Sequence, residues 1–261
     1  MNQPARRNLR ALTLYDVARA VEEDRVALNF QPIVRARETR FPMFHEGLIR
    51  IFDQEGNLRI AGDFIDIIEG SEIGNFVDQC ALELAICRLR ADPAIRVSIN
   101  MSPRTIWDED WMYLLDGAGQ RDRHVTERLI VEFTESSAMH SKDKTIEFME
   151  YCRKYGVCFA VDDFGAGHTV LGHLRDFHFD ILKIDGSICQ DVGTNVDNQV
   201  ILKAIMSVAQ HFEMATVAEY IDNEAAAKKC MELGVDGLQG FLYGRGELFN
   251  VAHPELLAQG A

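Results

Sequence analysis

Three short apolar runs in the middle of the chain decide the expected fold: Leu129-Ile-Val-Glu-Phe-Thr134, Cys158-Phe-Ala-Val-Asp162 and Ile181-Leu-Lys-Ile-Asp185. Each run has the length of a buried strand, and each ends in a polar or acidic residue. A pattern with helical spacing, Lys142–Tyr155, separates the first run from the second. This alternation predicts parallel strands joined by crossover helices.

The same alternation extends outward in both directions. Five further strands are expected at Val26–Val34, Met43–Arg50, Arg96–Asn100, Thr216–Ile221 and Leu238–Tyr243. The other expected helices are Leu14–Glu23, Gly74–Arg90, Asn198–Phe212 and Asn223–Leu233. Eight strands alternating with helices in about 250 residues predict an α/β fold of the (β/α)8 or TIM barrel type. A doubly wound open sheet is the rival, but no Gly-x-Gly-x-x-Gly follows the first strand to support it.

Composition limits the partners and the location of the protein. The 261 residues contain 27 Lys and Arg against 41 Asp and Glu, a net charge of −14. Such a surface repels duplex nucleic acid and anionic membranes, so neither is expected as a partner. No run of 18 apolar residues and no signal-peptide pattern occurs. The six cysteines form no Cys-x-x-Cys pair and are expected to be reduced core thiols, which predicts a cytoplasmic protein.

Polar side chains occur at the ends of strand after strand. They are Glu46, Asn100, Glu132, Asp162, Asp163, Lys183, Asp185 and Glu219, and Gln239 opens the eighth expected strand. A single acid at a strand end is more often a turn or helix cap, so the prediction depends on the set. In a barrel the carboxyl ends of the strands converge on one face, where these acids would repel one another. One lysine cannot balance them, and oxygen ligands without His or Cys predict Mg²⁺ or Mn²⁺.

The adjacent pair Asp162 and Asp163 suggests a site for two metal ions with one bridging carboxylate. Two such ions suit in-line displacement at phosphorus, since one activates the attacking water and both stabilise the phosphoryl charge. Arg50 and Lys183 would add positive charge beside the phosphate.

Eight short motifs, in order and with matching spacing, resemble the EAL domain family. They are Gln31-Pro-Ile, Glu46-Gly-Leu-Ile-Arg50, Asn100-Met-Ser-Pro103, Glu132-Phe-Thr-Glu135, Asp162-Asp-Phe-Gly-Ala-Gly167, Leu182-Lys-Ile-Asp185, Ala218-Glu219 and Gln239-Gly240. The resemblance covers roughly residues 14–250. The expected organisation is an N-terminal extension at 1–13, an EAL phosphodiesterase domain at 14–250 and a C-terminal tail at 251–261.

The resemblance implies a specific fold and activity. The barrel would be a modified (β/α)8 barrel whose first strand runs antiparallel to the rest. The enzyme would hydrolyse cyclic di-GMP to linear 5′-pGpG with Mg²⁺ or Mn²⁺, in a two-metal site that Ca²⁺ inhibits. A homodimer is also implied.

The resemblance assigns roles residue by residue. The metal ligands would be Glu46, Asn100, Glu132, Asp162 and Asp163, with Asp162 bridging. The catalytic set would be Lys183, Glu219 and Glu46, with Lys183 assisting the hydrolytic water. The substrate-binding residues would be Gln31, Arg50, Gln239 and Asp185. Glu135 would anchor the loop that follows the fifth expected strand, the Cys158–Asp162 run.

The chain departs from the family pattern at four places. Gly47 replaces the usual alanine, which predicts looser placement of Glu46 because glycine weakens a strand by roughly 0.5–1 kcal/mol. The others are Gly165–Leu171, where Tyr-Ser-Ser is usual, Tyr220-Ile-Asp222, where Gly-Val-Glu is usual, and Gly244-Arg-Gly246, where proline is common. Two other functions therefore stay open. One is a degenerate EAL domain that binds cyclic di-GMP or a protein without catalysis, and the other is an enolase-like enzyme that abstracts a proton.

Overall fold

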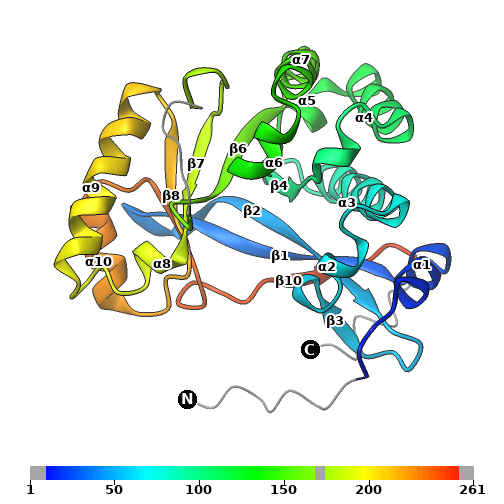
Figure 1. Cartoon of the computed structure of the whole chain (residues 1–261), viewed down its shortest axis with the longest axis horizontal. Helices are drawn as coiled ribbons and strands as arrows, with labels where there is room; N and C mark the ends of the chain where they lie inside the picture. Colours follow the sequence, from blue (N-terminus) through cyan, green and yellow to red (C-terminus); the bar gives the residue numbers. More distant parts are fainter. Residues whose placement is uncertain (1–9, 168–173, 253–261) are drawn as a thin grey trace.

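The computed structural model describes residues 10–167 and 174–252, and its centre is a closed barrel of strands (Figure 1). Around the barrel the order is β1 (Val26–Arg35), β2 (Glu38–Phe52), β4 (Val97–Asn100), β5 (Leu129–Thr134), β6 (Cys158–Phe164), β7 (Ile181–Ile184), β8 (Ala215–Ala218) and β9 (Gly237–Gln239). Pairing of β9 with β1 closes the ring. The expected (β/α)8 architecture is confirmed.

Strand β1 is the exception to the parallel pattern. It pairs antiparallel with β2 on one side and with β9 on the other, whereas the pairs from β2 to β9 are parallel. A short turn joins β1 to β2, since antiparallel neighbours need no crossover helix. The antiparallel first strand is therefore confirmed. Two short strands that the sequence patterns did not predict extend the sheet, β3 (Leu58–Ile60) beside β2 and β10 (Glu247–Phe249) beside β1.

Helices lie around the outside of the barrel (Figure 1). They are α1 (Leu14–Glu22), α2 (Ile65–Ile68), α3 (Glu72–Ala91), α4 (Glu109–Arg121), α5 (Arg123–Thr126), α6 (Glu135–His140), α7 (Lys142–Arg153), α8 (Gly186–Cys189), α9 (Val196–His211) and α10 (Glu224–Glu232). The five expected helices correspond to α1, α3, α7, α9 and α10 and differ from them by one or two residues at most ends. Helix α4 was not among them.

A second hydrophobic cluster joins α1 to the barrel. Thr13 forms a capping box with Asp16 at the start of α1, and this fixes where the helix begins. Val17 and Ala20 on the inner face of α1 are fully buried in a cluster that includes Ile51 of β2. Helix α1 is thus part of the same packed unit as the barrel.

The interior of the barrel consists of two layers of side chains. The apolar layer comprises Ile33, Phe44, Ile130, Ala160, Ile181 and Val217. The polar layer comprises Gln31, Glu46, Glu132, Asp162, Lys183 and Glu219, each two positions from an apolar-layer residue of its strand. Residues two apart on a strand face the same side, so both layers point inward. In β1 the order is reversed because that strand runs the opposite way.

The last two barrel strands end earlier than expected. β8 stops at Ala218 rather than continuing to Ile221, and β9 stops at Gln239. Tyr220 has a left-handed φ of 54°, which a strand cannot contain. Gly240 then lies so close to Ile221 that a Cβ would come within 2.2 Å of its carbonyl oxygen. Gln239, which was expected to open the eighth strand, therefore ends it, and this places Gln239 at the polar end of the barrel.

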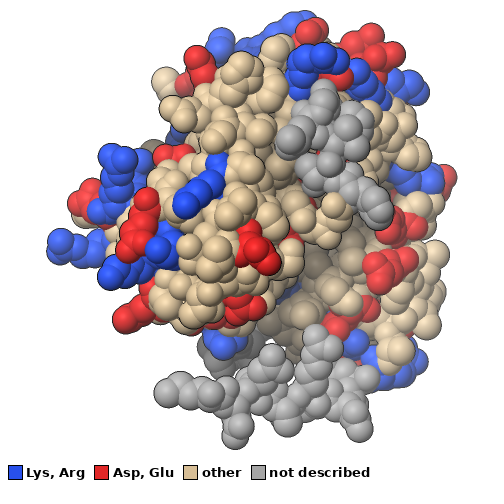
Figure 2. All heavy atoms as spheres, turned by 60° about the vertical axis from the view of Figure 1, so that its left-hand side comes forward, with Lys and Arg blue, Asp and Glu red and all other residues tan. Residues whose placement is uncertain are grey.

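The described residues also show how surface charge, cysteines and long helices are distributed in the protein. On the face shown in Figure 2, acidic and basic side chains are interspersed over a mostly uncharged surface. All six cysteines lie within the described ranges and are free thiols. Within these ranges the helices are too short or too polar to cross a lipid bilayer.

Candidate active site

Lys183 lies at the centre of the polar layer, surrounded by four carboxylates. Its Nζ is 2.6 Å from Glu132 Oε2, 2.9 Å from Asp162 Oδ1, 2.9 Å from Glu219 Oε1 and 3.2 Å from Glu46 Oε2. The lysine side chain is fully buried. One positive charge therefore faces four acidic groups supplied by β2, β5, β6 and the residue after β8, and the cluster carries an excess of negative charge when these acids ionise.

The excess of acid shifts the protonation equilibria. Burial raises the pKa of Glu132 to about 8, since the nearby Lys183 offsets only part of the cost of burying the carboxylate. Burial likewise raises the pKa of Glu219 well above its usual range. Burial disfavours the charged form of Lys183, but the surrounding carboxylates outweigh it and raise the lysine pKa well above normal. Lys183 is therefore a permanent cation in this arrangement.

Glu46 is held by more partners than the other acids. Asn100 Nδ2 donates to Glu46 Oε1 at 3.0 Å, and Gln239 Nε2 donates to Glu46 Oε2 at 2.6 Å. Burial opposes ionisation of Glu46, but Lys183 and these two donors lower its pKa overall. The strand is closely packed at Gly47, since a Cβ there would lie 3.2 Å from atoms of Leu28, Phe30 and Ser98. The looser placement of Glu46 that Gly47 was expected to cause stays a prediction.

A bulge brings Asp162 and Asp163 to the same end of the barrel. Successive strand residues normally point to opposite faces, but the β6–β7 register shifts between Val161 and Phe164. Asp163 also has a left-handed φ of 54°. Burial, and then the neighbouring Asp162, raises the pKa of Asp163. Both carboxylates are consequently available at one site.

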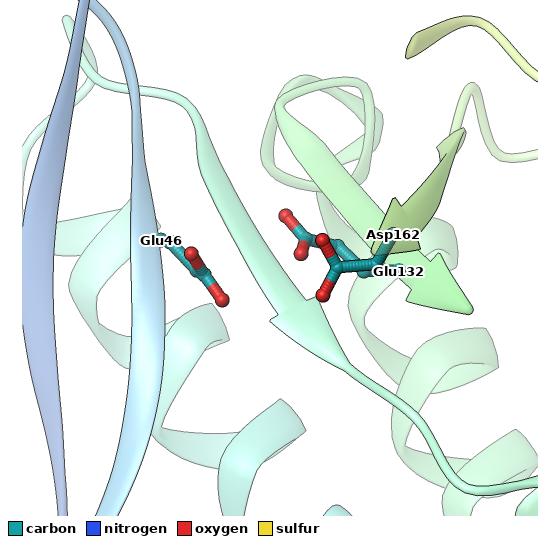
Figure 3. A group of neighbouring side chains, drawn as sticks. All are labelled: Glu46, Glu132 and Asp162. Atoms are coloured by element: carbon teal, nitrogen blue, oxygen red, sulfur yellow. The ribbon is translucent and has the colours of Figure 1, made fainter. Parts of the chain in front are cut away.

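Two groups of carboxylates have ligand atoms close enough to share a metal ion. One is Glu46, Glu132 and Asp162, and the other is Asp162, Asp163 and Glu219. Within each group the ligand atoms lie within 4.8 Å of one another, and Asp162 belongs to both. Figure 3 shows the carboxylate of Glu46 pointing from β2 toward those of Glu132 and Asp162.

These residues fit a hard divalent cation. Glu132 Oε1 is buried and has no hydrogen-bond partner among the described residues, which is costly unless a cation binds it. The available ligands are carboxylate oxygens, with the amide of Asn100 beside them, and the two groups contain no His or Cys. Such a set is typical of Mg²⁺ or Mn²⁺. The structure thus brings the five predicted metal ligands together.

A pocket of about 700 Å³ opens above the polar layer. Its lining includes the acids Asp162, Asp163 and Glu219. It also includes the apolar residues Ile60, Ala61, Ile65, Val77 and Ala81, supplied by the β3–α2 segment and α3. This volume is in the range of pockets that bind ligands the size of a nucleotide or larger.

Arginine and aromatic side chains complete the pocket. Arg50 is half-buried, its Nη1 donates to the carbonyl of Ile49 at 2.8 Å, and burial lowers its pKa. The Arg245 guanidinium lies 4.0 Å from the ring centroid of Phe241, a cation–π contact. Since a guanidinium remains charged in proteins, both arginines present a cation to an anionic ligand.

The other predicted substrate residues have additional structural partners. Gln31 lines the pocket, its Nε2 donates to the Gly244 carbonyl at 3.1 Å, and its Oε1 accepts from Gln239 Nε2 at 3.3 Å. Asp185 caps α8 by accepting from Ser187 N at 2.9 Å and does not line the pocket as the described residues form it. Its substrate-binding role stays a prediction.

Glu135 begins α6 directly after β5. The loop that it was expected to anchor lies partly at 168–173, outside the described residues. The anchoring role also stays a prediction.

Several residues that line the pocket were not predicted as site residues from the sequence. Among them are Asp78, Tyr220, Phe241 and Arg245. Asp78 accepts hydrogen bonds from Ser102 N at 2.9 Å and Thr105 Oγ1 at 2.6 Å, and burial raises its pKa to about 6. An acid on the buried face of α3, next to Val77 and near Ala81, was a signal that could have identified it.

Comparisons with known proteins agree with this geometry. The model of the EAL domain matches residues 15–246. Signaling protein YkoW of Bacillus subtilis is 31% identical over 232 residues, which cover 87% of this chain and 29% of that protein. Cyclic di-GMP phosphodiesterase PdeB of Shewanella oneidensis is 27% identical over 233 residues, which cover 88% and 27% respectively. The chain thus spans less than a third of the length of these two relatives.

Solved structures show the same architecture. The structure "PaMucR Phosphodiesterase, c-di-GMP complex" has a TM-score of 0.79 and 27% identity, covering 89% of this chain and 96% of that chain. An EAL domain protein from Listeria monocytogenes has a TM-score of 0.78 at 24% identity, covering 91% and 94%, and shows the likeness of fold alone.

Proposed function

Because the chain belongs to the EAL domain family, we propose that it hydrolyses cyclic di-GMP to linear 5′-pGpG with Mg²⁺ or Mn²⁺. The observation that carries this proposal is the pair of carboxylate groups sharing Asp162 at the base of a pocket that also presents two arginines. Like charges at such density are unfavourable in a fold that needs no cation there. The degenerate alternative has less support, because the predicted ligands are present and converge.

Different residues of the chain would hold the ions, position the acids and orient Glu46. Glu46, Asn100, Glu132 and Asp162 would hold one ion, and Asp162, Asp163 and Glu219 the other. When bound, the ions supply an acidified water and neutralise charge on the phosphoryl oxygens. Lys183 stays charged within 3.2 Å of four of these acids, so it fixes their positions. Its assistance to the hydrolytic water stays a prediction. Gln239 keeps Glu46 oriented through its 2.6 Å hydrogen bond.

The pocket would bind the rest of the dinucleotide. Arg50 and Arg245 present cations to its phosphates, which the acidic chain otherwise repels. Phe241 is 56% exposed, and Ile60, Ala61 and Ile65 add aliphatic lining, so apolar surface is available to the bases. A pocket lined by both charged and apolar side chains matches a molecule that combines phosphates with bases.

Product analysis tests this function. Purified protein is incubated with cyclic di-GMP in Mn²⁺, in Ca²⁺ and in EDTA, and pGpG is followed by chromatography. We expect pGpG in Mn²⁺ alone and none from Glu46→Ala. Binding in Ca²⁺ without turnover in Mn²⁺ would instead identify a receptor. Neither binding nor turnover would contradict the proposal and favour a protein partner or another substrate.

A further inference from the structure

Tyr220 occupies an unfavourable backbone conformation at the edge of the pocket. Its φ is 54°, in the left-handed region that a bulky side chain rarely adopts. The side chain is 58% exposed and lines the pocket next to Glu219. Strained residues of this kind persist where the surrounding structure holds them, often at ligand sites. The left-handed backbone at Tyr220 therefore suggests a role for this residue at the pocket.

Gly186 provides the space for the tyrosine ring. A Cβ at Gly186 would lie 2.4 Å from Tyr220 Cδ2 and 2.6 Å from Cγ. Gly186 has no left-handed φ, so its backbone does not demand glycine. Its lack of a side chain lets one edge of the Tyr220 ring rest against α8. The ring is thus supported on one side and exposed on the other.

The segment after Tyr220 is tied to the segment that carries Phe241. Ile221 N donates to the Gln239 carbonyl at 2.9 Å, and Phe241 N donates to Asp222 Oδ1 at 3.0 Å. Two exposed aromatic residues, Tyr220 and Phe241, therefore belong to one connected wall of the pocket.

We propose that Tyr220 is a specificity-determining residue whose ring packs against one nucleobase of the bound dinucleotide. The inference rests on the proposed function, since it needs a nucleotide in this pocket. A neutral aromatic face attracts any base, whereas the phosphates would be attracted by the ions that the neighbouring carboxylates hold. The ring thus favours an orientation with a base over Tyr220 and the phosphates over the metal ligands. A ligand without a base at that place gains nothing from it.

Steady-state kinetics on four variants test this assignment. Tyr220→Leu removes the aromatic face, and we expect KM for cyclic di-GMP in Mn²⁺ to rise about tenfold with kcat changed less than about twofold. Tyr220→Phe keeps the face and should match the wild type. Tyr113→Leu, a change of equal chemistry at a 78% exposed residue on α4, is the matched control and should have no effect.

Tyr220→Gly separates ligand contact from folding. It removes the ring and relieves the left-handed backbone, so Tm should rise by about 2–4 °C while KM rises as in Tyr220→Leu. A normal KM in Tyr220→Leu, with an active wild type, would overturn the inference and leave the proposed function intact. A fall in kcat with unchanged KM would overturn it too, since it would place Tyr220 at the reacting groups. If the wild type neither binds nor hydrolyses cyclic di-GMP, both proposals fail.

Discussion

The two layers inside the barrel are formed by the same strands and are almost equally buried, yet they have opposite chemistry. Ile130, Ala160 and Ile181 fill the apolar layer, and Glu132, Asp162 and Lys183 follow two positions later in the polar layer. The apolar layer stabilises the fold by removing surface from water. The polar layer buries charge, which is unfavourable without partners. We infer that the polar layer is retained for its chemistry and the apolar layer for stability.

The largest expected difference in stability is between variants of Lys183 in the polar layer and of Ile181, two positions earlier on β7, in the apolar layer. Lys183→Met leaves four acids without their cation and should cost about 3–5 kcal/mol of unfolding free energy in metal-free protein. Ile181→Val removes one methyl group and should cost about 0.5–1.5 kcal/mol. Urea unfolding in EDTA measures both. A smaller cost for Lys183→Met than for Ile181→Val would contradict the account of the polar layer.

Stability of the metal-free protein should depend on pH through Glu132. Its pKa is about 8 when folded and near 4.5 when unfolded, so the folded state holds one more proton between these values. Stability should then fall as pH rises from about 5 to 8, by about 1 kcal/mol per pH unit. Saturating Mn²⁺ displaces that proton and should remove the decline. Thermal unfolding from pH 5 to 8 with and without Mn²⁺ tests this. A metal-free stability that rises over this range would refute the assignment.

Glu132→Gln should separate stability from metal binding. At pH 7 the buried acid is mostly protonated, so the neutral amide should change unfolding free energy by less than about 1 kcal/mol without metal. The rise in Tm that Mn²⁺ causes in the wild type should be reduced, because one of the two ion sites has lost a ligand. Ile130→Val, one layer below, is the control. It should lose about 0.5–1.5 kcal/mol and keep the full response to Mn²⁺. An intact Mn²⁺ response in Glu132→Gln would remove Glu132 from the ligand set.

The smallest expected effect on stability and activity is at Gly47, which follows the inward-facing Glu46 on β2. A Cβ there meets Leu28, Phe30 and Ser98 at 3.2 Å, so Gly47→Ala requires small shifts and should cost less than about 1.5 kcal/mol. Glu46 points inward and keeps its partners, so kcat should change less than about twofold. Unfolding and turnover measure the two effects. A large loss of kcat with normal stability would show that Gly47 controls the position of Glu46.

Much of the site followed from the sequence because strands have a period of two. Once β5, β6 and β7 were located, Glu132, Asp162 and Lys183 had to face the same interior. Asp163 was grouped with them as an adjacent acid, but the bulge and left-handed φ that turn it to the site depend on the β6–β7 pairing. Gln239 was expected in the site but at the wrong end of its strand. The strand ends there because Gly240 packs against Ile221, a tertiary contact that local patterns do not show.

The pocket walls were harder to predict than its base. Asp78 lies within a helix, and Tyr220 and Phe241 lie in segments expected to be strands. Their places at the pocket depend on tertiary packing, such as the hydrogen bond from Phe241 N to Asp222. Local sequence patterns predict which way a side chain points from its own helix or strand. They therefore identify polar residues at strand ends, and they miss residues that tertiary packing brings to the site.

Titration of Mn²⁺ into wild-type protein, Asp162→Asn and Asp163→Asn, with the bound ions counted, decides whether the polar layer holds two ions through one shared carboxylate. We expect two ions per wild-type chain, one in Asp163→Asn and neither in Asp162→Asn. No ion in the wild type, or two ions retained by Asp162→Asn, would contradict it.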